Sequence, residues 1–331
     1  MTARACLLAC LVSVALAGAG CEIGIAAGGA EATFDRDLTV SGPVDLDVRS
    51  GSGDIQVRTG PVGTVHVHGR ARAWMGRWIN FSGETGDEAI RRIEQNPPIE
   101  QSGNRILVGP RDGTNRYNGI SISYVITVPA DTRLTARSGS GDLEVGDVAG
   151  PVDAGTGSGD IRVGRTSGAA SVRTGSGSIE VNGAQSIVAR TGSGNVLASA
   201  IAGDIEASSG SGDISVSQAT AGRTEVSTGS GDVTVTGAHG PVRVHASSGD
   251  ILLEGMPSAP WEVSASSGDV RMRLPGDAAF DLDLRSGSGS IDTSVPVTTS
   301  GTQSRRELRG QVRGGGPRVH VSTSSGSISL R

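Results

Sequence analysis

The residues most suited to chemistry recur in one short phrase, Thr/Ser-Gly-Ser-Gly followed by Asp or Ser and then by Ile-x-Val. Residues 156–181 contain this phrase twice. Glycine-rich loops bind phosphates at the start of a helix, and Gly/Asp repeats bind calcium, so the phrase has two candidate chemistries. A phosphate loop is the weaker candidate, because the phrase lacks the Lys of a P-loop and no helix follows it.

A calcium site fits the phrase poorly as well. Calcium-binding β-rolls place Gly-Gly-x-Gly-x-Asp in units of about nine residues, whereas here Asp follows Gly directly and the phrase occurs once in about 18 residues. The Asp position also accepts Ser178, Asn195, Ser290 and Ser327. Asp, Asn and Ser are the residues that hydrogen-bond the backbone of their own turn, and the Ser and Asn copies interrupt what would be a repulsive column of carboxylates.

We therefore expect the phrase to form structural turns, with glycines that permit positive φ, and we expect no metal and no cofactor. The expected turn residues are Gly53, Asp54, Gly141, Asp142, Gly159, Asp160, Gly212, Asp213, Gly231, Asp232, Gly249, Asp250, Gly268 and Asp269.

Other candidate sites are isolated. His66 and His68 could bind a metal as a pair, but the alternation predicts that Val65 and Val67 point inward while both histidines face solvent, and no third ligand is suggested. The remaining histidines, His239, His245 and His320, are scattered.

Catalysis has no marked residues either. Serine is abundant but lies in no nucleophile-elbow motif, and the acids are spread along strand faces, so that no particular carboxylate pair stands out as a glycosidase site. Trp74, Trp78 and Phe81 could stack on sugars, although a hydrophobic cover for the end of the fold is the favoured interpretation. The sequence predicts no enzyme.

The spacing of the phrase predicts the architecture that positions these residues. Its second glycine falls at Gly141, Gly159, Gly177, Gly194, Gly212, Gly231, Gly249 and Gly268, in steps of 18, 18, 17, 18, 19, 18 and 19. Each period contains two segments in which apolar and polar residues alternate, the pattern of a half-buried strand. Stacked copies, with each strand paired to its equivalent in the next copy about 4.8 Å away, would enclose a thin core of Val and Ile.

The predicted fold is therefore all-β: a β-solenoid with coils of about 18 residues, two short strands per coil and one short helix in an irregular N-terminal part. The hexapeptide helix is excluded because it needs an aliphatic residue at every sixth position, and Ile161 would align with Ser167 and Arg173. Pectate-lyase-like helices need longer coils. A propeller is a weaker alternative, and an antiparallel meander of hairpins stays open.

The chain divides into unequal parts. Residues 1–20 read as a secretory signal, with a short positive start and an apolar run too short to span a membrane. Cys21 follows in an imperfect lipobox and is favoured as a lipidation site over ordinary cleavage near residue 19, because the rest of the mature chain has no Cys. Residues 21–33 are expected to be a tether, and residues 34–331 a single solenoid domain.

Within that domain, residues 34–137 are expected to form irregular coils and residues 138–297 the regular repeats, with a loop and a last coil in residues 298–331. Residues 86–96 predict the helix, because acids begin it, Ile90 and Ile93 mark a buried face, and Pro97-Pro98 end it. Strands are expected at 105–108 and 120–128. Solenoid ends need a cover, and this region is expected to provide one with its helix and five of the eight aromatic residues.

The phrase, residues 124–145 (YVITVPADTRLTARSGSGDLEV) and the ending GGGPRVHVSTSSGSISL make the chain resemble the bacterial putative-adhesin family of β-strand-repeat proteins, a domain of unknown function. The resemblance covers about residues 34–331 and implies a β-solenoid in the cell envelope, with no catalytic residues to transfer.

The net charge of −5 argues against a nucleic-acid partner. We expect a non-enzymatic envelope protein, exported to the periplasm, outer membrane or cell surface, that acts as an adhesin or as a structural or interaction module. Its partner is an unidentified envelope or surface component, and it touches the membrane only through a lipid on Cys21. The alternatives are a carbohydrate- or calcium-binding solenoid and an envelope-sensing regulatory module.

Overall fold

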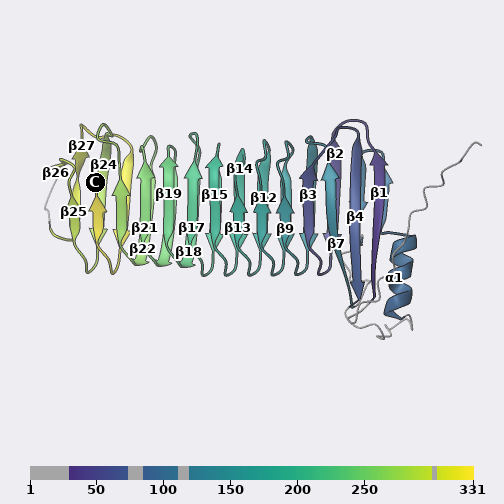
Figure 1. Cartoon of the computed structure of the whole chain (residues 1–331). Helices are drawn as coiled ribbons and strands as arrows, with labels where there is room; N and C mark the ends of the chain where they lie inside the picture. Colours follow the sequence, from purple (N-terminus) through teal and green to yellow (C-terminus); the bar gives the residue numbers. More distant parts are fainter. Residues whose placement is uncertain (1–29, 74–84, 111–118, 300–303) are drawn as a thin grey trace, which may run out of the picture.

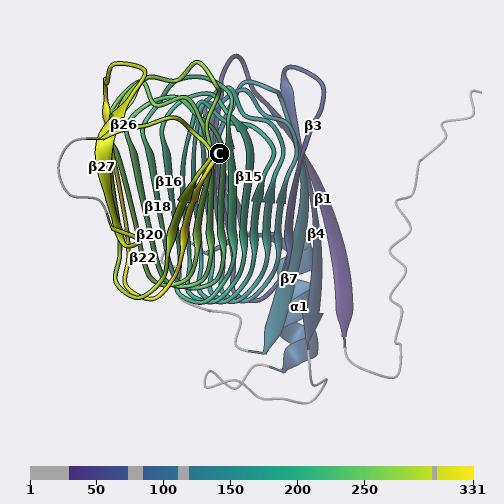
Figure 2. The same cartoon turned by 90° about the vertical axis from the view of Figure 1, so that its left-hand side faces the viewer.

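The computed structural model describes residues 30–73, 85–110, 119–299 and 304–331. Its strands form two long sheets that face each other across a thin core, as the view along the long axis shows (Figure 2). Sheet A has 14 strands and sheet B has 15. Each coil that contains the phrase contributes one strand to sheet B, turns through the phrase, and contributes the next strand to sheet A (Figure 1).

The regular coils stack in chain order in the middle of the solenoid (Figure 1). Their sheet B strands are β8 (Thr132–Ser138), β10 (Val152–Thr156), β12 (Ala169–Thr174), β14 (Ser186–Thr191), β16 (Ile205–Ser209), β18 (Thr224–Ser230), β20 (Val242–Ser248) and β22 (Trp261–Ser267). Their sheet A strands are β9 (Leu143–Val145), β11 (Ile161–Val163), β13 (Ile179–Val181), β15 (Val196–Ile201), β17 (Ile214–Gln218), β19 (Val233–Ala238), β21 (Ile251–Gly255) and β23 (Val270–Arg273).

Equivalent residues of neighbouring coils pair in parallel. Ile161 lies beside Leu143 on one side and Ile179 on the other, and Val163 lies beside Val145 and Val181. The solenoid prediction is confirmed, and the parallel pairing excludes the meander and the propeller. The inward Val and Ile side chains are almost completely buried, because β-branched residues pack well on a pleated surface.

The N-terminal end is widened by long antiparallel strands. In sheet A, β3 (Ile55–Thr59) is followed in space by β7 (Ile120–Val128), β4 (Thr64–Ala73) and β1 (Glu31–Thr39). In sheet B, β2 (Val44–Ser50) is followed by β6 (Arg105–Val108) and β5 (Ile99–Ser102). These strands and α1 (Gly86–Gln95) form the N-terminal cap. The strand β1 begins at Glu31, so its first residues lie within the segment expected to be the tether.

The helix α1 lies at the lower end of this cap in Figure 1. The Thr85 hydroxyl accepts a hydrogen bond from the Glu88 backbone N–H, while the Glu88 carboxylate accepts one from the Thr85 backbone N–H, so the two residues form a capping box. The bond from the Thr85 backbone lowers the pKa of Glu88. Ala89, Ile90 and Ile93 are buried, so the helix covers core with the face that its periodicity predicts.

The C-terminal end departs from chain order. Beyond β22 and β23 the chain forms β24 (Phe280–Ser286), β25 (Ile291–Thr293), β26 (Thr298–Thr299) and β27 (Glu307–Val312), and then β28 (Arg318–Thr323) and β29 (Ile328–Leu330). In space β28 lies between β22 and β24, and β29 lies between β23 and β25. The last coil of the chain is therefore the penultimate coil of the stack, which the sequence interpretation did not anticipate.

The N-terminal end has the same arrangement. The coil of β2 and β3 lies between the coil of β6 and β7 and the coil of β8 and β9, although β6 and β7 follow it in the chain. At both ends a terminal segment is thus held on two sides by parallel strands. Antiparallel strands, β4 with β1 in sheet A and β27 with β26 in sheet B, lie outside these coils.

No helix among the residues that the structure describes is long and apolar enough to cross a membrane.

Candidate functional site

The acidic position of the phrase forms a continuous hydrogen-bond ladder. The Oδ1 atom of Asp142 accepts the backbone N–H of Asp160 at 2.9 Å, and Asp160 Oδ1 accepts the N–H of Ser178 at 2.9 Å. Eleven such bonds of 2.8–3.4 Å run without interruption from Ser123 to Ser290. The expectation that these side chains bond their own turn is therefore incorrect, because each one bonds the next coil instead. The Ser and Asn copies continue the ladder because their oxygens also accept hydrogen bonds.

A second ladder comes from the hydroxyl residue that opens the phrase. The Thr174 hydroxyl donates to the carbonyl of Gly159 in the preceding coil at 2.9 Å and accepts the N–H of Gly177 in its own turn at 3.1 Å. Its position is filled by Ser or Thr in most coils, and Ala246 and Ala265 are exceptions. Most of these hydroxyls are buried. Their hydrogen bonds offset the free-energy cost of burying a polar group away from water.

The glycines of the phrase serve close approach between coils. A Cβ at Gly159 would lie 2.2 Å from the carbonyl oxygen of Gly141, and a Cβ at Gly177 would lie 1.9 Å from that of Gly159. The expectation of positive φ is incorrect for most of them, since only Gly231 and Gly249 have positive values, 158° and 154°, close to extended backbone. Glycine is required here because any side chain would collide with the backbone of the coil below.

Replacing Asp160 tests whether the ladder is structural. We expect Asp160→Ala to lower the free energy of unfolding by about 1 kcal/mol, because it leaves the Ser178 N–H without its acceptor. Asp160→Asn keeps an acceptor oxygen, so its free energy of unfolding should be close to that of wild type. Chemical denaturation of both variants, repeated with millimolar calcium, measures this. Since the Asp oxygens already accept backbone N–H groups, calcium should not shift the midpoint, and a large calcium-dependent rise would contradict the structural role.

The structure places His66 and His68 as the alternation predicts. Both lie on β4 and are partly exposed, whereas Val65 and Val67 are buried. His66 Nδ1 lies 2.7 Å from an Asp37 oxygen. His68 Nδ1 lies 2.9 Å from an Asp35 oxygen. These cross-strand pairs between β1 and β4 do not form a metal-binding group, and none occurs among the residues that the structure describes.

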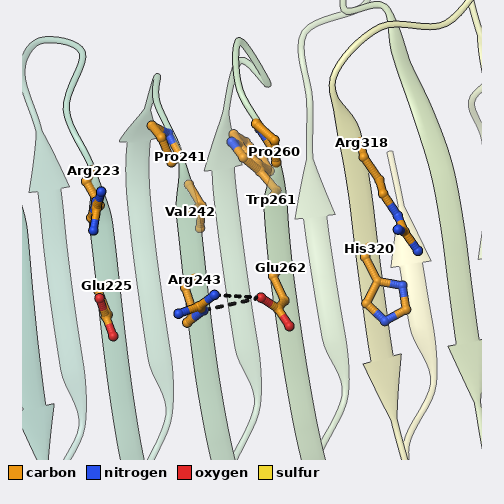
Figure 3. A pocket seen from close by; sticks show the side chains of 10 residues that line it. All are labelled: Arg223, Glu225, Pro241, Val242, Arg243, Pro260, Trp261, Glu262, Arg318 and His320. Atoms are coloured by element: carbon orange, nitrogen blue, oxygen red, sulfur yellow. Dashed lines mark hydrogen bonds and ion pairs between the residues drawn. The ribbon is translucent and has the colours of Figure 1, made fainter.

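A groove lies on the outward face of sheet B near its C-terminal end (Figure 3). Its volume is about 680 Å³. The floor includes Pro241, Val242 and Pro260, and Figure 3 shows Arg243 paired with Glu262 across it, at 3.1 Å. Trp261 also lines the groove, but its side chain is buried and its indole N–H donates to the Gly240 carbonyl at 2.9 Å. The ring is thus part of the core and does not offer a face for sugar stacking.

The charges beside the groove follow an alternating order from coil to coil. Residues directly opposite one another along neighbouring strands are Glu225, Arg243, Glu262, His320, Asp283 and Arg309. Opposite charges in facing positions stabilise strand pairs. This order favours the register in which β28 is inserted between β22 and β24, because His320 then lies between Glu262 and Asp283.

The most buried acid of this series is Asp283, which sits among cations. Arg318 approaches its carboxylate to 2.9 Å, Arg285 to 3.1 Å, Arg309 to 3.3 Å and His320 to 3.4 Å. Burial alone would raise the pKa of Asp283, but the hydrogen bond from Arg318 and the charges of Arg285 and His320 outweigh it and hold the pKa below its usual value. Sequence reasoning missed this cluster, because its members come together only through the inserted coil.

The lowered pKa predicts a pH dependence of stability. A carboxyl whose pKa is lower in the folded state stabilises the protein above its unfolded pKa of about 3.9, and this contribution is lost as the pH falls through the folded value. We expect Asp283→Asn to be less stable at neutral pH and to lose less further stability on acidification than wild type. Urea unfolding at several pH values measures this. Exposed Asp292 offers the control, and an Asp283→Asn profile parallel to that of wild type would refute the prediction.

A second groove lies on the outward face of sheet A near the N-terminal cap, with a volume of about 730 Å³. Ser123, Asp54 and Asp142 of the ladder line it, together with Arg72 and Arg162. The turn residues predicted from the sequence therefore border this groove at one end of the solenoid. Elsewhere in the stack they serve to join the coils.

The aromatic residues that the structure describes are all buried: Phe34, Tyr124, Trp261 and Phe280. Phe34 and Tyr124 pack edge to face with ring centroids 6.4 Å apart, inside the N-terminal cap. Trp74, Trp78, Phe81 and Tyr117 lie outside the described residues, as do the signal segment and Cys21.

A comparison with solved structures finds three whose alignments span most of both chains. A putative adhesin from Bacteroides fragilis NCTC 9343 is 11% identical over 90% of this chain and 97% of its own, with a TM-score of 0.38. A putative adhesin from Parabacteroides distasonis ATCC 8503 is 10% identical over 90% and 96%, with a TM-score of 0.36. A putative lipid binding protein from the same organism is 11% identical over 90% and 96%, with a TM-score of 0.26. No curated protein matches the chain.

The family is shown by a direct match of the sequence. Residues 35–200 and 99–331 each match the Toastrack domain DUF4097, a domain of unknown function, and together the two matches span residues 35–331, which include every regular coil. The chain therefore belongs to the Toastrack DUF4097 family.

Proposed function

We propose that this chain is exported to the cell envelope and acts there as a non-enzymatic interaction module, with residues 1–20 as its signal, residues 21–33 as a tether lipidated at Cys21, and residues 34–331 as one domain that contacts a surface partner. The observation that supports this best is the pair of inter-coil ladders. They hold the coils in register, so the outward side chains of each sheet stand in straight rows about 4.8 Å apart.

The outward face of sheet B is the proposed contact surface. It carries the groove of Figure 3, where Arg223 and Glu225 lie at one end. Neither side chain has a hydrogen bond or an ion pair with another residue in the described part of the chain, so both are available to a partner. The buried aromatic residues favour a polar contact of this kind over sugar stacking, because no described ring is presented on the face.

Co-sedimentation of the mature chain with envelopes isolated from the producing bacterium tests this function. We expect the protein to sediment with the envelopes, and Arg223→Ala/Glu225→Ala to reduce the bound fraction without a loss of stability. The matched control is Arg162→Ala/Glu180→Ala on sheet A, which also removes one positive and one negative charge. Wild type that stays in the supernatant, or equal loss by both double variants, would refute the proposal.

The tether has its own test. Cys21→Ser in the full chain should move the protein from the membrane fraction to the soluble exported fraction, and metabolic labelling with a fatty acid should disappear. A variant that keeps both the label and the membrane fraction would rule out lipidation at Cys21.

A further inference from the structure

The groove of Figure 3 has an apolar floor between charged side chains. Pro241 and Pro260 form this floor; they stand directly before β20 and β22 and are exposed. The Pro241 carbonyl accepts the Thr224 N–H at 2.9 Å, and the Pro260 carbonyl accepts the Val242 N–H at 3.1 Å. Proline has no N–H, so the two residues offer a ligand no backbone donor, and both carbonyls already accept a bond within the sheet. The floor is therefore suited to apolar groups.

The charged side chains in the middle of the groove and at its β28 end have partners within the fold. Arg318 lies 2.9 Å from the Asp283 carboxylate, and His320 lies 3.4 Å from it. In the middle of the groove, the Nε and Nη2 atoms of Arg243 donate to the Glu262 carboxylate at 3.2 and 3.1 Å. These side chains therefore leave little unsatisfied charge for a ligand.

The β18 end of the groove differs, because its two charged side chains make no hydrogen bond or ion pair with another described residue. Arg223 directly precedes β18, Glu225 is the second residue of that strand, and both are exposed. Glu225 faces Arg243 in the register, but Arg243 donates to Glu262 on its other side. One guanidinium and one carboxylate are thus open to a ligand at the same end of the groove.

The two open groups are separated along the strand. Residues two apart on one face of a strand lie about 7 Å from each other. At the same spacing in the sequence, Arg49 and Asp47 approach to 2.7 Å, whereas no ion pair joins Arg223 and Glu225. A ligand that satisfies both must therefore carry an anionic and a cationic group about 7 Å apart, next to an apolar portion that covers the floor.

We propose that the groove binds the end of a peptide whose last residue is a diamino acid, such as lysine, with a free carboxylate. Arg223 binds this carboxylate, because a planar guanidinium matches it in shape, and Glu225 binds the side-chain ammonium. The four-carbon stem of lysine spans about the distance between them. The preceding apolar residues of the peptide lie over Pro241 and Pro260. The inference rests on the proposed function, since it names the class of envelope component that this surface contacts.

Two simpler occupants fit the groove less well. A small anion would need only Arg223, and it would leave Glu225 and the apolar floor unused. A neutral sugar is commonly held on an exposed aromatic ring, and the described aromatic residues are all buried.

Binding of the peptide acetyl-Ala-Val-Ala-Lys, with a free carboxylate, to the purified mature chain tests the proposal by calorimetry. Two comparison peptides change one group each. A terminal amide removes the carboxylate, and norleucine in place of lysine removes the ammonium. We expect each change to weaken binding about tenfold, since each removes a hydrogen bond between charged groups.

Two variants assign each group of the peptide to its partner. Arg223→Gln should weaken binding of the acid peptide about tenfold and leave binding of its amide unchanged. Glu225→Gln should weaken binding of the lysine peptide by a similar factor and leave binding of the norleucine peptide unchanged. Arg162→Gln/Glu180→Gln on sheet A removes one positive and one negative charge and should leave the affinity unchanged.

No binding of the lysine peptide, equal affinity for its amide, or equal weakening by the sheet A variant would overturn the inference. Binding that depends on Arg223 but not on Glu225 would overturn it as well, because the groove would then be a simple anion site. Envelope co-sedimentation separates this failure from that of the proposed function. If the protein sediments with envelopes through Arg223 and Glu225 but ignores the peptide, the interaction module stands and the peptide end is wrong. If it does neither, both proposals fail.

Discussion

Gly177→Ala should destabilise the solenoid by about 3 kcal/mol, at the upper end of the usual cost of overpacking. The new Cβ would lie 1.9 Å from the Gly159 carbonyl oxygen and 2.4 Å from its carbonyl carbon. Both are backbone atoms, which no rotamer change can move away. Relief requires separating two coils in the middle of the stack, and that would also stretch the bond from the Thr174 hydroxyl to Gly159.

A clash at one interface between coils should affect the unfolding of the whole stack, because the fold is a one-dimensional array of coils. Each coil contacts only its neighbours, so a weakened interface lets the two halves of the stack unfold separately. We therefore expect urea unfolding of Gly177→Ala to begin earlier and to lose its single cooperative transition. Circular dichroism combined with hydrogen exchange across residues 160–195 would show where the opening starts.

Gly276→Ala is the matched control. A Cβ at Gly276 would have no heavy atom within 4 Å, and the residue does not have positive φ, so the same methyl group enters open space. The free energy of unfolding of Gly276→Ala should stay within about 0.5 kcal/mol of the wild-type value, as for other surface substitutions. Equal effects of the two substitutions would show that the glycine stack tolerates side chains, against the close approach of the coils.

Much of the fold could be predicted because its information is local. The 18-residue spacing and the alternation around Ile161 and Val172 determine coil length and which side chains face inward. Parallel stacking follows, since short strands of this kind have no other way to bury their apolar face.

What the sequence could not predict depends on contacts between coils. The replacement of Asp by Ser178 and Asn195 is consistent with a turn cap or with a ladder, and only the distance to the next coil decides between them. The Asp283 cluster requires the register of strands that are far apart in the chain, because Arg309 and Arg318 reach Asp283 from β27 and β28. In particular, the insertion of β28 brings His320 beside Glu262, a neighbour that no local pattern indicates.

The inserted coil also has an energetic consequence. Because β28 separates β24 from β22, every strand of sheet B beyond it is attached to the stack through β28. A disruption of β28 should therefore release β24 and β27 as well, although their own residues are unchanged. The alternating charges around His320 and the buried side chains of β28 together stabilise the pairing of β28 with β22 and β24.

Val321→Asp should disrupt the pairing of β28 with β22 and β24. We expect it to lower the free energy of unfolding by about 4 kcal/mol or more, because it buries an unpaired charge. Val321 is fully buried and lies between Val263 of β22 and Leu284 of β24 in the register. We expect hydrogen exchange and limited proteolysis to show lost protection in residues 276–331, while the coils from β8 to β20 keep theirs.

Ser322→Asp provides the matched control on the same strand, because Ser322 points outward and faces Arg285. The same carboxylate is then solvated and close to a cation, so protection should match wild type. Equal loss in both variants would argue against the inserted position of β28. Loss spread evenly over the whole chain by Val321→Asp would instead show that the stack unfolds as one unit. If the end beyond it is attached only through the coil of β28 and β29, that end must lose protection before the regular coils do.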